Sequence, residues 1–400
     1  MNRAGNKWAV LALVTSAQLG ASIVQQGIGA LGPFLAVTLA LDNTRLGTIF
    51  GVLTAGSACS TALAGVAVDR YGERRMILFS GATMGVALCL AAAIPSYAWL
   101  LACFFIVGIG YAASTPAGGR AILLWFATGR GLAMGIRQMG VPLGGIVGAL
   151  ALPALASAAN YRVALVCGGV LTVVPAIATA VLYREPEVEV RAVRSLRAIV
   201  RASLEVARDE RLVFVTLACM ILIFSQAAML TFYTLTLVRD DGLDPRVAAG
   251  ALAIAQLGAS AGRLGWGYIS DRVFGGDRML PVIVACLGVT LTSIAVARLP
   301  AHNVAAAYAV AAVLGFTAAG WNGLFAAAQV EIGGIERAGS ALGIGLTGLF
   351  GASAVGAPLF GAVAAAFGYA IAWYALGAFV LIAIWPAQMA RRAIARANAR

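Results

Sequence analysis

Long apolar runs alternate with short charged segments along the whole chain. A helix that crosses a bilayer needs ~20 consecutive apolar residues, and most of these runs reach that length. The first run continues well beyond the ~7–15 apolar residues of a cleavable signal peptide, so we expect it to be a retained helix. The pattern therefore predicts an all-α membrane protein with twelve transmembrane helices, at roughly residues 8–38, 46–68, 76–94, 98–123, 131–157, 162–183, 211–238, 246–269, 279–298, 303–329, 339–361 and 369–389.

One longer polar segment divides these runs into two sets of six. We predict an N-terminal six-helix bundle at 1–183, a cytoplasmic linker at 184–210 and a C-terminal six-helix bundle at 211–400. Apolar positions in the linker are spaced among arginines in a way that permits an amphipathic helix along the inner membrane surface: Leu196, Ile199, Val200, Leu204 and Val206. A solvated connector that sets orientation through its charge is the alternative.

A glycine–aspartate–arginine pattern occurs twice, 202 residues apart, each time after an apolar run. The two copies are Gly65-x-x-x-Asp69-Arg70-x-Gly72-x-Arg74-Arg75 and Gly267-x-x-x-Asp271-Arg272. A charged segment repeated at the same place in two halves is typical of a parallel internal repeat. The glycines permit close contact with a neighbouring helix, and the aspartates can accept hydrogen bonds from nearby arginines. As a simple charge run, each copy would only fix the topology.

This repeated pattern resembles the signature loops between helices 2 and 3, and again between helices 8 and 9, of the major facilitator superfamily of secondary transporters. The resemblance spans the chain and implies the fold of that superfamily, in which two six-helix halves are related by pseudo-twofold symmetry. It also implies transport by alternating access, controlled by a cytoplasmic conformational latch. The latch would consist of Gly65, Asp69, Arg70, Gly72, Arg74, Arg75, Gly267, Asp271 and Arg272.

Charge is scarce and unevenly distributed. The chain is 61% hydrophobic and 11% charged, with a mean hydropathy of +0.92 and a net charge of +12. If the N-terminus is cytoplasmic, twenty of the 28 basic residues lie inside and five lie in outer loops. This positive-inside bias predicts a multi-pass protein of a bacterial-type inner (cytoplasmic) membrane with both termini cytoplasmic. Basic residues beside anionic lipid account for the net charge, so no nucleic-acid partner is expected.

The residues that usually carry catalysis or bind metals are sparse. The six cysteines lie within predicted spans without paired spacing, and the single histidine, His302, lies in a short outer loop. All acidic residues fall in loops or near helix ends, so we expect no buried carboxylate as a proton carrier. We therefore expect a protein that is not an enzyme and holds no metal and no cofactor. A monomer is also expected. A membrane-embedded enzyme or a sensor is a remote alternative.

Three arginines lie inside predicted spans: Arg120, Arg137 and Arg263. Each is about 10–12 Å from the cytoplasmic end of its helix, at 1.5 Å per residue. An arginine at that depth is costly unless it meets an anion, a carbonyl group or water, so each is a functional candidate. The resemblance places helices 5 and 8 opposite each other, with Arg137 and Arg263 on two walls of one cavity. The alternative is that these arginines bond helix-end carbonyls or Glu331.

The guanidinium fork can grip both oxygens of a carboxylate. Arg263 also resembles the helix-8 arginine of the oxalate, monocarboxylate and nitrate carriers, although Ala259 stands where monocarboxylate carriers have an aspartate. The candidate substrate-binding residues are Arg263, Arg137, Arg120, Gln25, Gln26, Tyr233, Trp321 and Asn322. The last five could instead tie helices together.

The predicted function is secondary active transport of a small organic anion, foremost a carboxylate, by alternating access. The expected partners are this small-molecule substrate and the lipid bilayer. The alternative is an exporter of a neutral or cationic compound, including drugs. The arginine that proton-coupled antiporters of the superfamily carry on helix 4 would align near Phe104, and helix 11 has no lysine.

Overall fold

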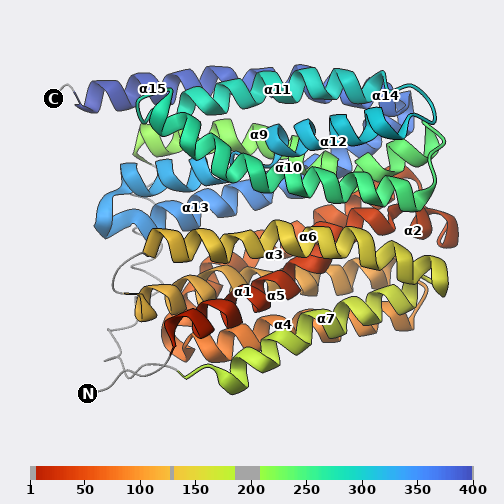
Figure 1. Cartoon of the computed structure of the whole chain (residues 1–400), viewed down its shortest axis with the longest axis horizontal. Coiled ribbons are helices and arrows are strands. Elements are labelled where there is room, and N and C mark those ends of the chain that lie inside the picture. The colour runs from red at the N-terminus through yellow and green to blue at the C-terminus, as the bar shows by residue number, and fades with distance from the viewer. Residues whose placement is uncertain (1–5, 127–129, 185–207, 399–400) are drawn as a thin grey trace. The chain divides into compact units, whose positions relative to one another are not determined.

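The computed structural model describes residues 6–126, 130–184 and 208–398, and it is almost entirely helical (Figure 1). The chain forms two compact units. The first contains the residues up to Leu39 and those from Val52 to the end of the sixth span, and the second contains Ala40–Gly51 and the residues from Glu210 onward. The expected amphipathic helix of the linker falls at residues outside the described ranges.

The first unit is built from helices that follow one another through short connections. They are α1 (Lys7–Gly27), the 3-10 turn η1 (Ile28–Leu31), α2 (Gly32–Thr38), α3 (Asn43–Tyr71), α4 (Glu73–Ala93), α5 (Tyr97–Trp125), α6 (Arg130–Ala158) and α7 (Tyr161–Leu182). The first turns of α3 belong by their contacts to the second unit. The remaining part of α3 packs in the first unit, against α5.

The second unit has the same kind of construction. Its elements are α9 (Glu210–Arg239), α10 (Pro245–Arg272), α11 (Met279–Ala297), α12 (Val304–Ala318), α13 (Asn322–Phe367), α14 (Tyr369–Val380), the 3-10 turn η2 (Leu381–Ala383) and α15 (Ile384–Asn398). Three of these helices begin with a side-chain cap, in which Asp209, Asp244 and Asn303 accept hydrogen bonds from backbone N–H groups of the first turn. These caps satisfy donors that have no partner within the helix.

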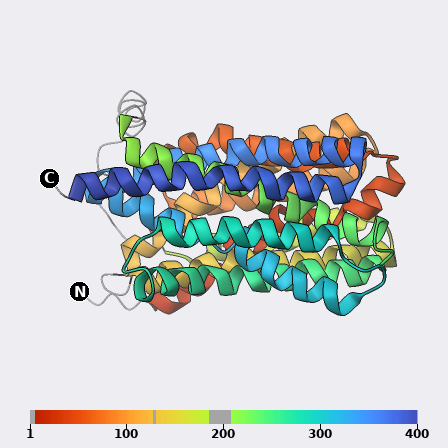
Figure 2. The same ribbon diagram turned by 90° about the horizontal axis from the view of Figure 1, so that it is seen from above.

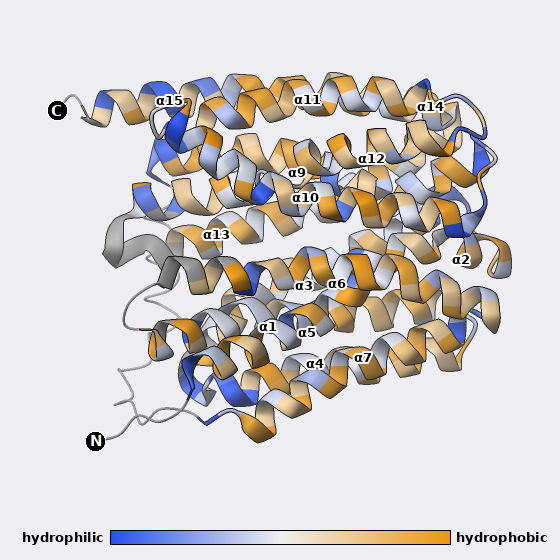
Figure 3. Ribbon diagram, viewed as in Figure 1, coloured by the Kyte–Doolittle hydropathy of each residue, from blue (hydrophilic) through white to orange (hydrophobic). Residues whose placement is uncertain are grey.

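Twelve segments of the described residues are long and apolar enough to cross a membrane, which confirms the predicted fold class. The tenth and eleventh, Val304–Gly333 and Ala341–Phe367, share α13, and the twelfth, Tyr369–Ala397, joins α14 to α15. Hydrophobic residues run along the helices, and hydrophilic residues gather mainly at their ends (Figure 3). This distribution suits helices whose middle parts lie in hydrocarbon.

The internal repeat is visible in how the helices pack within each unit (Figures 1 and 2). In the first unit α1 packs on α6 and α4 packs on α7, and in the second α9 packs on α13 and α11 packs on α14. These pairs join the first and fifth spans and the third and sixth spans of each half. Each unit therefore repeats one packing plan.

Glycines make the same helix contact possible in both units. A Cβ on Gly56 or Gly108 would overlap a backbone carbonyl where α3 meets α5, and a Cβ on Gly258 or Gly315 would do so where α10 meets α12. Gly56 and Gly258 are separated by the same 202 residues as the charged patterns. Small residues that let backbones approach are the usual device for packing helices in a membrane. The close backbone contact of the second and fourth spans is thus part of the repeat.

Candidate functional site

Arg137 is the most completely buried charge described in the first unit. It projects from α6 and is 1% exposed. Its Nη2 donates to Gln18 Oε1 on α1 at 2.7 Å and to the backbone oxygen of Ser114 on α5 at 2.9 Å. Its Nε has no acceptor among the described residues. The guanidinium therefore joins three helices and retains an unused donor.

Neighbouring polar groups hold this arrangement. Ser114 Oγ donates to Gln18 Oε1 at 3.0 Å, and Gln18 Nε2 donates to Ser22 Oγ at 3.2 Å. Gln18 and Ser22 lie one turn apart and share a face of α1. The space for the guanidinium is provided by Gly118, because a Cβ at that position would overlap Arg137. The sequence of α5 thus accommodates the arginine of α6.

The charge of Arg137 is not balanced by a nearby acid. No described residue forms an ion pair with it, and its hydrogen bonds go to an amide oxygen and a backbone carbonyl. Neutral acceptors lower the cost of burying a guanidinium, but they do not neutralise it. The interior of the first unit therefore carries a positive charge at Arg137 that an anion would stabilise.

Arg120 has a different environment. Its Nη1 donates to the backbone oxygen of Val68 at 2.6 Å, and its Nε lies 3.4 Å from Glu73 Oε2. Glu73 also accepts a hydrogen bond of 2.6 Å from the hydroxyl of Tyr183. Arg120 therefore has a backbone carbonyl partner, as the alternative interpretation expected, but its carboxylate partner is Glu73 and not Glu331. Its role in substrate binding stays a prediction, and we do not include it in the site proposed below.

The expectation that no carboxylate is buried is wrong, because Asp241 is 7% exposed and Glu73 is buried more deeply still. This residue stands at the first position of α4, near a helix end as expected, yet it is only 2% exposed. The reason is that α5 and the end of α7 cover it with Arg120 and Tyr183. A helix-end position in the sequence does not reveal such cover.

In the second unit, the predicted binding residues are mostly engaged in contacts between neighbouring segments. Tyr233 is fully buried on α9, and its hydroxyl donates to the backbone oxygen of Ala307 at 2.6 Å. Trp321 is fully buried before α13, and its Nε1 donates to the backbone oxygen of Ala318 at 2.7 Å. Arg263 is half-buried on α10. Tyr233 thus has the contact between helices that the alternative interpretation gives it, whereas the bond of Trp321 is local, to a residue three positions earlier.

Asn322 makes a polar pair that the sequence did not reveal. Its Nδ2 donates to Gln226 Oε1 on α9 at 3.0 Å and to the backbone oxygen of Ala319 at 2.8 Å. In the first unit Gln25 and Gln26 are buried on α1, and Gln25 Oε1 has no donor among the described residues. The signal that was missed is spacing, because Gln18, Ser22 and Gln25 recur on one face of α1.

The second copy of the charged pattern forms a network at the end of α10. Arg278 donates to Asp271 Oδ1 at 2.6 Å and to Glu331 Oε1 at 2.7 Å. Hydrogen bonding to Glu331, and also to Asp271, raises the pKa of Arg278 above its usual value. Arg272 is exposed beside this network. One predicted latch residue, Asp271, is therefore in an ion pair within its own unit.

The first copy of the pattern has fewer described contacts. Arg74 donates from Nε to the backbone oxygen of Ala180, and Arg70 lies 5.3 Å from the ring centre of Tyr71. Arg75 is exposed, and the side chain of Asp69 lies outside the described residues. Gly72 has φ 83°, a conformation that favours glycine, directly before α4.

Within their own units, Gly65 and Gly267 lie in open surroundings. A Cβ at either glycine would meet no atom of the described residues within 4 Å. Both glycines are near helix ends, beyond the region where the second and fourth spans approach closely at Gly56 and Gly258. The close backbone contacts described within each unit involve other glycines, and the packing role of Gly65 and Gly267 stays a prediction.

The described part of the chain contains no candidate metal site that could serve as an alternative functional site. No cluster of three or more histidine, cysteine, aspartate or glutamate side chains suits a metal ion there. The chemistry available near Arg137 is that of amides, hydroxyls and a guanidinium. Such groups bind and orient a ligand.

Comparison with known proteins identifies the family. Residues 14–347 match the model of the Major Facilitator Superfamily, and the chain belongs to that superfamily. An uncharacterized MFS-type transporter of Mycobacterium tuberculosis is 29% identical over 95% of this chain and 84% of the relative. The 3-(3-hydroxy-phenyl)propionate transporter of Escherichia coli is 28% identical over 64% of this chain and 62% of the relative.

Solved structures share the fold. The inward-facing, occupied structure of a bacterial homologue of the human lysosomal transporter Spinster has a TM-score of 0.75 and 18% identity, over 97% of this chain and 96% of that one. With twelve spans and this family, the chain is a multi-pass membrane transporter with a small-molecule substrate.

Proposed function

We propose that this transporter carries a small organic anion, foremost a carboxylate, and that Arg137 binds its negative charge. The observation that carries the proposal is the burial of this guanidinium at 1% exposure without a carboxylate partner among the described residues. A charge in that state is stabilised by an anion that arrives and leaves, which is what a carrier requires. Alternating access moves the bound anion across the membrane.

The hydrogen-bonding geometry favours an oxyanion. Nη2 is already committed to Gln18 and Ser114, whereas Nε retains its hydrogen for a further acceptor. Gln18 and Ser114 hold the guanidinium in place, so little side-chain freedom is lost when a ligand binds. The substrate named for the Escherichia coli relative, 3-(3-hydroxyphenyl)propionate, is a carboxylate, which supports this substrate class.

The proposal that the substrate is a carboxylate can be tested with the purified protein. We expect 3-(3-hydroxyphenyl)propionate or other mono- and dicarboxylates to raise the melting temperature, while the matching neutral amides do not. Hits should then cross the membrane of proteoliposomes. If only neutral or cationic compounds stabilise the protein and cross the membrane, the proposal of an anionic substrate is wrong. That result would favour the alternative, an exporter of neutral or cationic compounds.

Two glycines of α5 provide a matched test of Arg137. Gly118→Ala places a Cβ against the guanidinium, whereas Gly119→Ala meets only the end of Met134, at 3.8 Å. Both changes raise the helix propensity equally. We expect Gly118→Ala to weaken anion binding and Gly119→Ala to leave it unchanged. Equal affinities in the two variants would show that the position of the guanidinium is unimportant for the ligand.

Replacing the arginine with lysine tests the role of its guanidinium. Arg137→Lys keeps the charge but loses Nε, the donor without an acceptor among the described residues, and the planar group that Gln18 and Ser114 hold in place. Truncating one partner of a buried charge pair costs ~2–5 kcal/mol, which is roughly 30- to several-thousand-fold in the dissociation constant. Arg263→Lys should act in the same direction if both arginines contact the substrate. Wild-type affinity in Arg137→Lys would refute recognition by the guanidinium.

A further inference from the structure

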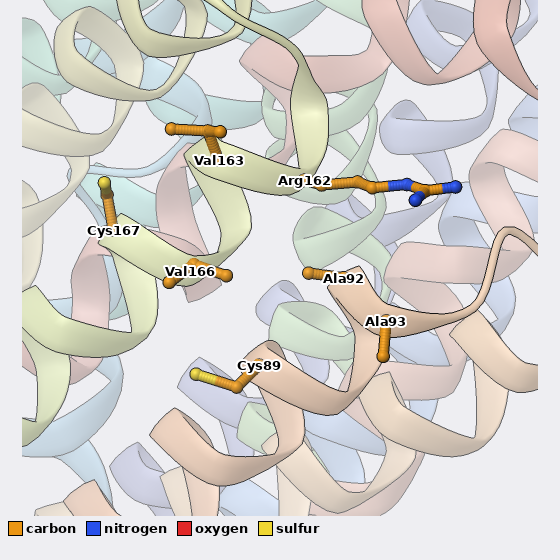
Figure 4. Close-up of a pocket in the computed structure, with 7 residues that line it drawn as sticks. All are labelled: Cys89, Ala92, Ala93, Arg162, Val163, Val166 and Cys167. Atoms are coloured by element: carbon orange, nitrogen blue, oxygen red, sulfur yellow. The ribbon is translucent and has the colours of Figure 1, made fainter.

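A groove lies on the first unit where the end of α4 meets the beginning of α7, and Figure 4 shows its lining. Its volume is about 330 Å³. The lining is almost entirely apolar, with one basic side chain. It consists of Cys89, Ala92, Ala93, Arg162, Val163, Val166 and Cys167.

The groove opens on the surface of helices that span the membrane. Both α4 and α7 are among the twelve predicted spans. Val163 and Val166 are 37% and 39% exposed, and Cys89 is exposed as well. Apolar side chains that are exposed on a spanning helix face lipid, so the groove is accessible to molecules of the bilayer.

Arg162 gives the groove its polarity. It is the second residue of α7, and its backbone N–H is capped by Asn160 Oδ1 at 3.0 Å. Its guanidinium makes no hydrogen bond or ion pair with the rest of the described chain. In Figure 4 the side chain extends past Ala92 and Ala93 at the end of α4. The positive end of the α7 dipole adds to this charge.

The order of groups along the groove matches a lipid molecule. Arg162 is in the first turn of α7, and Cys167 lies five residues further in, about 7.5 Å along the axis. At the same end of α4, Trp99 Nε1 donates to the backbone oxygen of Leu90 at 2.7 Å. Tryptophan is enriched where helices leave the hydrocarbon, at headgroup level. The charge therefore lies at headgroup depth and the apolar lining at acyl-chain depth.

We propose that this groove is a binding site for one anionic phospholipid. The headgroup phosphate pairs with the guanidinium of Arg162, and an acyl chain lies against Ala92, Val163 and Val166, between the thiols of Cys89 and Cys167. A guanidinium forms paired charge-assisted hydrogen bonds with a phosphate. A phospholipid of net negative charge is favoured because no described carboxylate neutralises Arg162. The proposal is independent of the substrate.

The thiols in the groove allow a direct test. Purified protein is alkylated with N-ethylmaleimide in detergent, with added dioleoylphosphatidylglycerol or dioleoylphosphatidylcholine, and each cysteine is quantified by peptide mass spectrometry. Cys59 on α3 is exposed and lies outside the groove, so it serves as the control thiol. With phosphatidylglycerol at ten times its Kd, we expect alkylation of Cys89 and Cys167 to slow about tenfold and that of Cys59 to stay unchanged.

A pair of matched variants tests the role of the charge. Arg162→Gln should abolish the protection by phosphatidylglycerol. Arg246→Gln should retain it, since Arg246 is likewise the second residue of a capped helix, α10, but lies outside the groove. Val166→Trp, which fills the groove, should also abolish the retention of phosphatidylglycerol in native mass spectrometry. Equal protection by both lipids, protection that persists in Arg162→Gln, or equal slowing at Cys59 would each overturn the proposal.

Discussion

At the scale of single residues, the protein buries its charges in two ways. Arg120 lies beside the carboxylate of Glu73, whereas among the described residues the acceptors of Arg137 are an amide oxygen and a backbone carbonyl. A paired charge is costly to separate, while an uncompensated one lowers the stability of the unliganded protein. The two arginines should therefore respond in opposite directions to the same substitution.

Methionine in place of each arginine tests this contrast. We expect Arg137→Met to raise the stability of the unliganded protein by about 1–4 kcal/mol, because an apolar side chain of similar length removes the buried charge. Arg120→Met should lower it by about 1–3 kcal/mol, because the buried Glu73 loses its partner. Thermal unfolding without ligand measures both changes. A loss of stability in Arg137→Met would mean that its charge is compensated in the free protein.

Asp241 makes stability depend on pH. It lies just after α9, is 7% exposed, and its Oδ2 has no donor among the described residues. Burial, together with the charge of Asp240, raises the pKa of Asp241 from 3.8 to about 6. The folded protein then holds this proton more tightly than the unfolded chain does. The contribution of Asp241 to stability is therefore full below about pH 4 and falls as the pH rises through 6.

Asparagine at this position should remove the dependence. We expect Asp241→Asn to be more stable than the wild type at pH 7.5 and to lose part of the decline in melting temperature between pH 4 and pH 7. Asp244→Asn is the control in the same loop, since asparagine caps α10 as well as aspartate does. A pH profile identical to that of the wild type in Asp241→Asn would assign the decline to other groups.

At the scale of helices, the two units pair the same elements with exchanged charges. In the first, Glu73 at the start of α4 pairs with Arg120 on α5. In the second, Arg278 before α11 pairs with Glu331 on α13. Both pairs connect the third and fourth spans of their half. The repeat thus conserves an ion pair between corresponding helices although the residue types are reversed.

Burial should make these two ion pairs unequal. Glu73 is 2% exposed, whereas the side chain of Glu331 is 51% exposed. Glu73→Gln is expected to lower stability by about 1–3 kcal/mol. Glu331→Gln is expected to cost about 0–1 kcal/mol, and this cost should shrink in high salt. Chemical unfolding at two salt concentrations measures the difference. A larger loss of stability in Glu331→Gln than in Glu73→Gln would contradict the expectation that the buried ion pair contributes more.

The sequence predicts some features of this structure and not others. The difference depends on whether local sequence or tertiary packing determines the feature. The spans follow from the length of apolar runs, so their number and places are predictable, and the repeat shows in glycine spacing such as Gly56 and Gly258. The partners of Arg120 and Arg137 depend on which face of a helix meets which neighbour. A depth count along the chain places both at one level and cannot separate them. Tertiary packing makes that distinction through Glu73 and Gln18.

At the scale of the whole molecule, the orientation in the membrane is inferred from the basic residues. These residues are more numerous at the helix ends of one side than at those of the other. Lys7 and Arg70 lie near ends of spans that are assigned to one side, and Arg162 and Arg246 lie near ends assigned to the other. Counting all loops, basic residues favour the first side by four to one. Because loops rich in lysine and arginine stay in the cytoplasm, both termini and the linker are expected there.

Cysteine labelling in whole cells tests this topology. In a background without native cysteines, we expect Ser195→Cys and Asn398→Cys to react with a membrane-impermeant maleimide only after the membrane is opened. Ala301→Cys, between the ninth and tenth spans, should react in intact cells, and it shows that the reagent reaches the outer loops. The odd number of spans between positions 195 and 301 places them on opposite sides. Labelling of position 195 in intact cells would therefore contradict either the twelve-span order or the orientation. The reaction of position 301 separates the two, because an inverted protein would protect it.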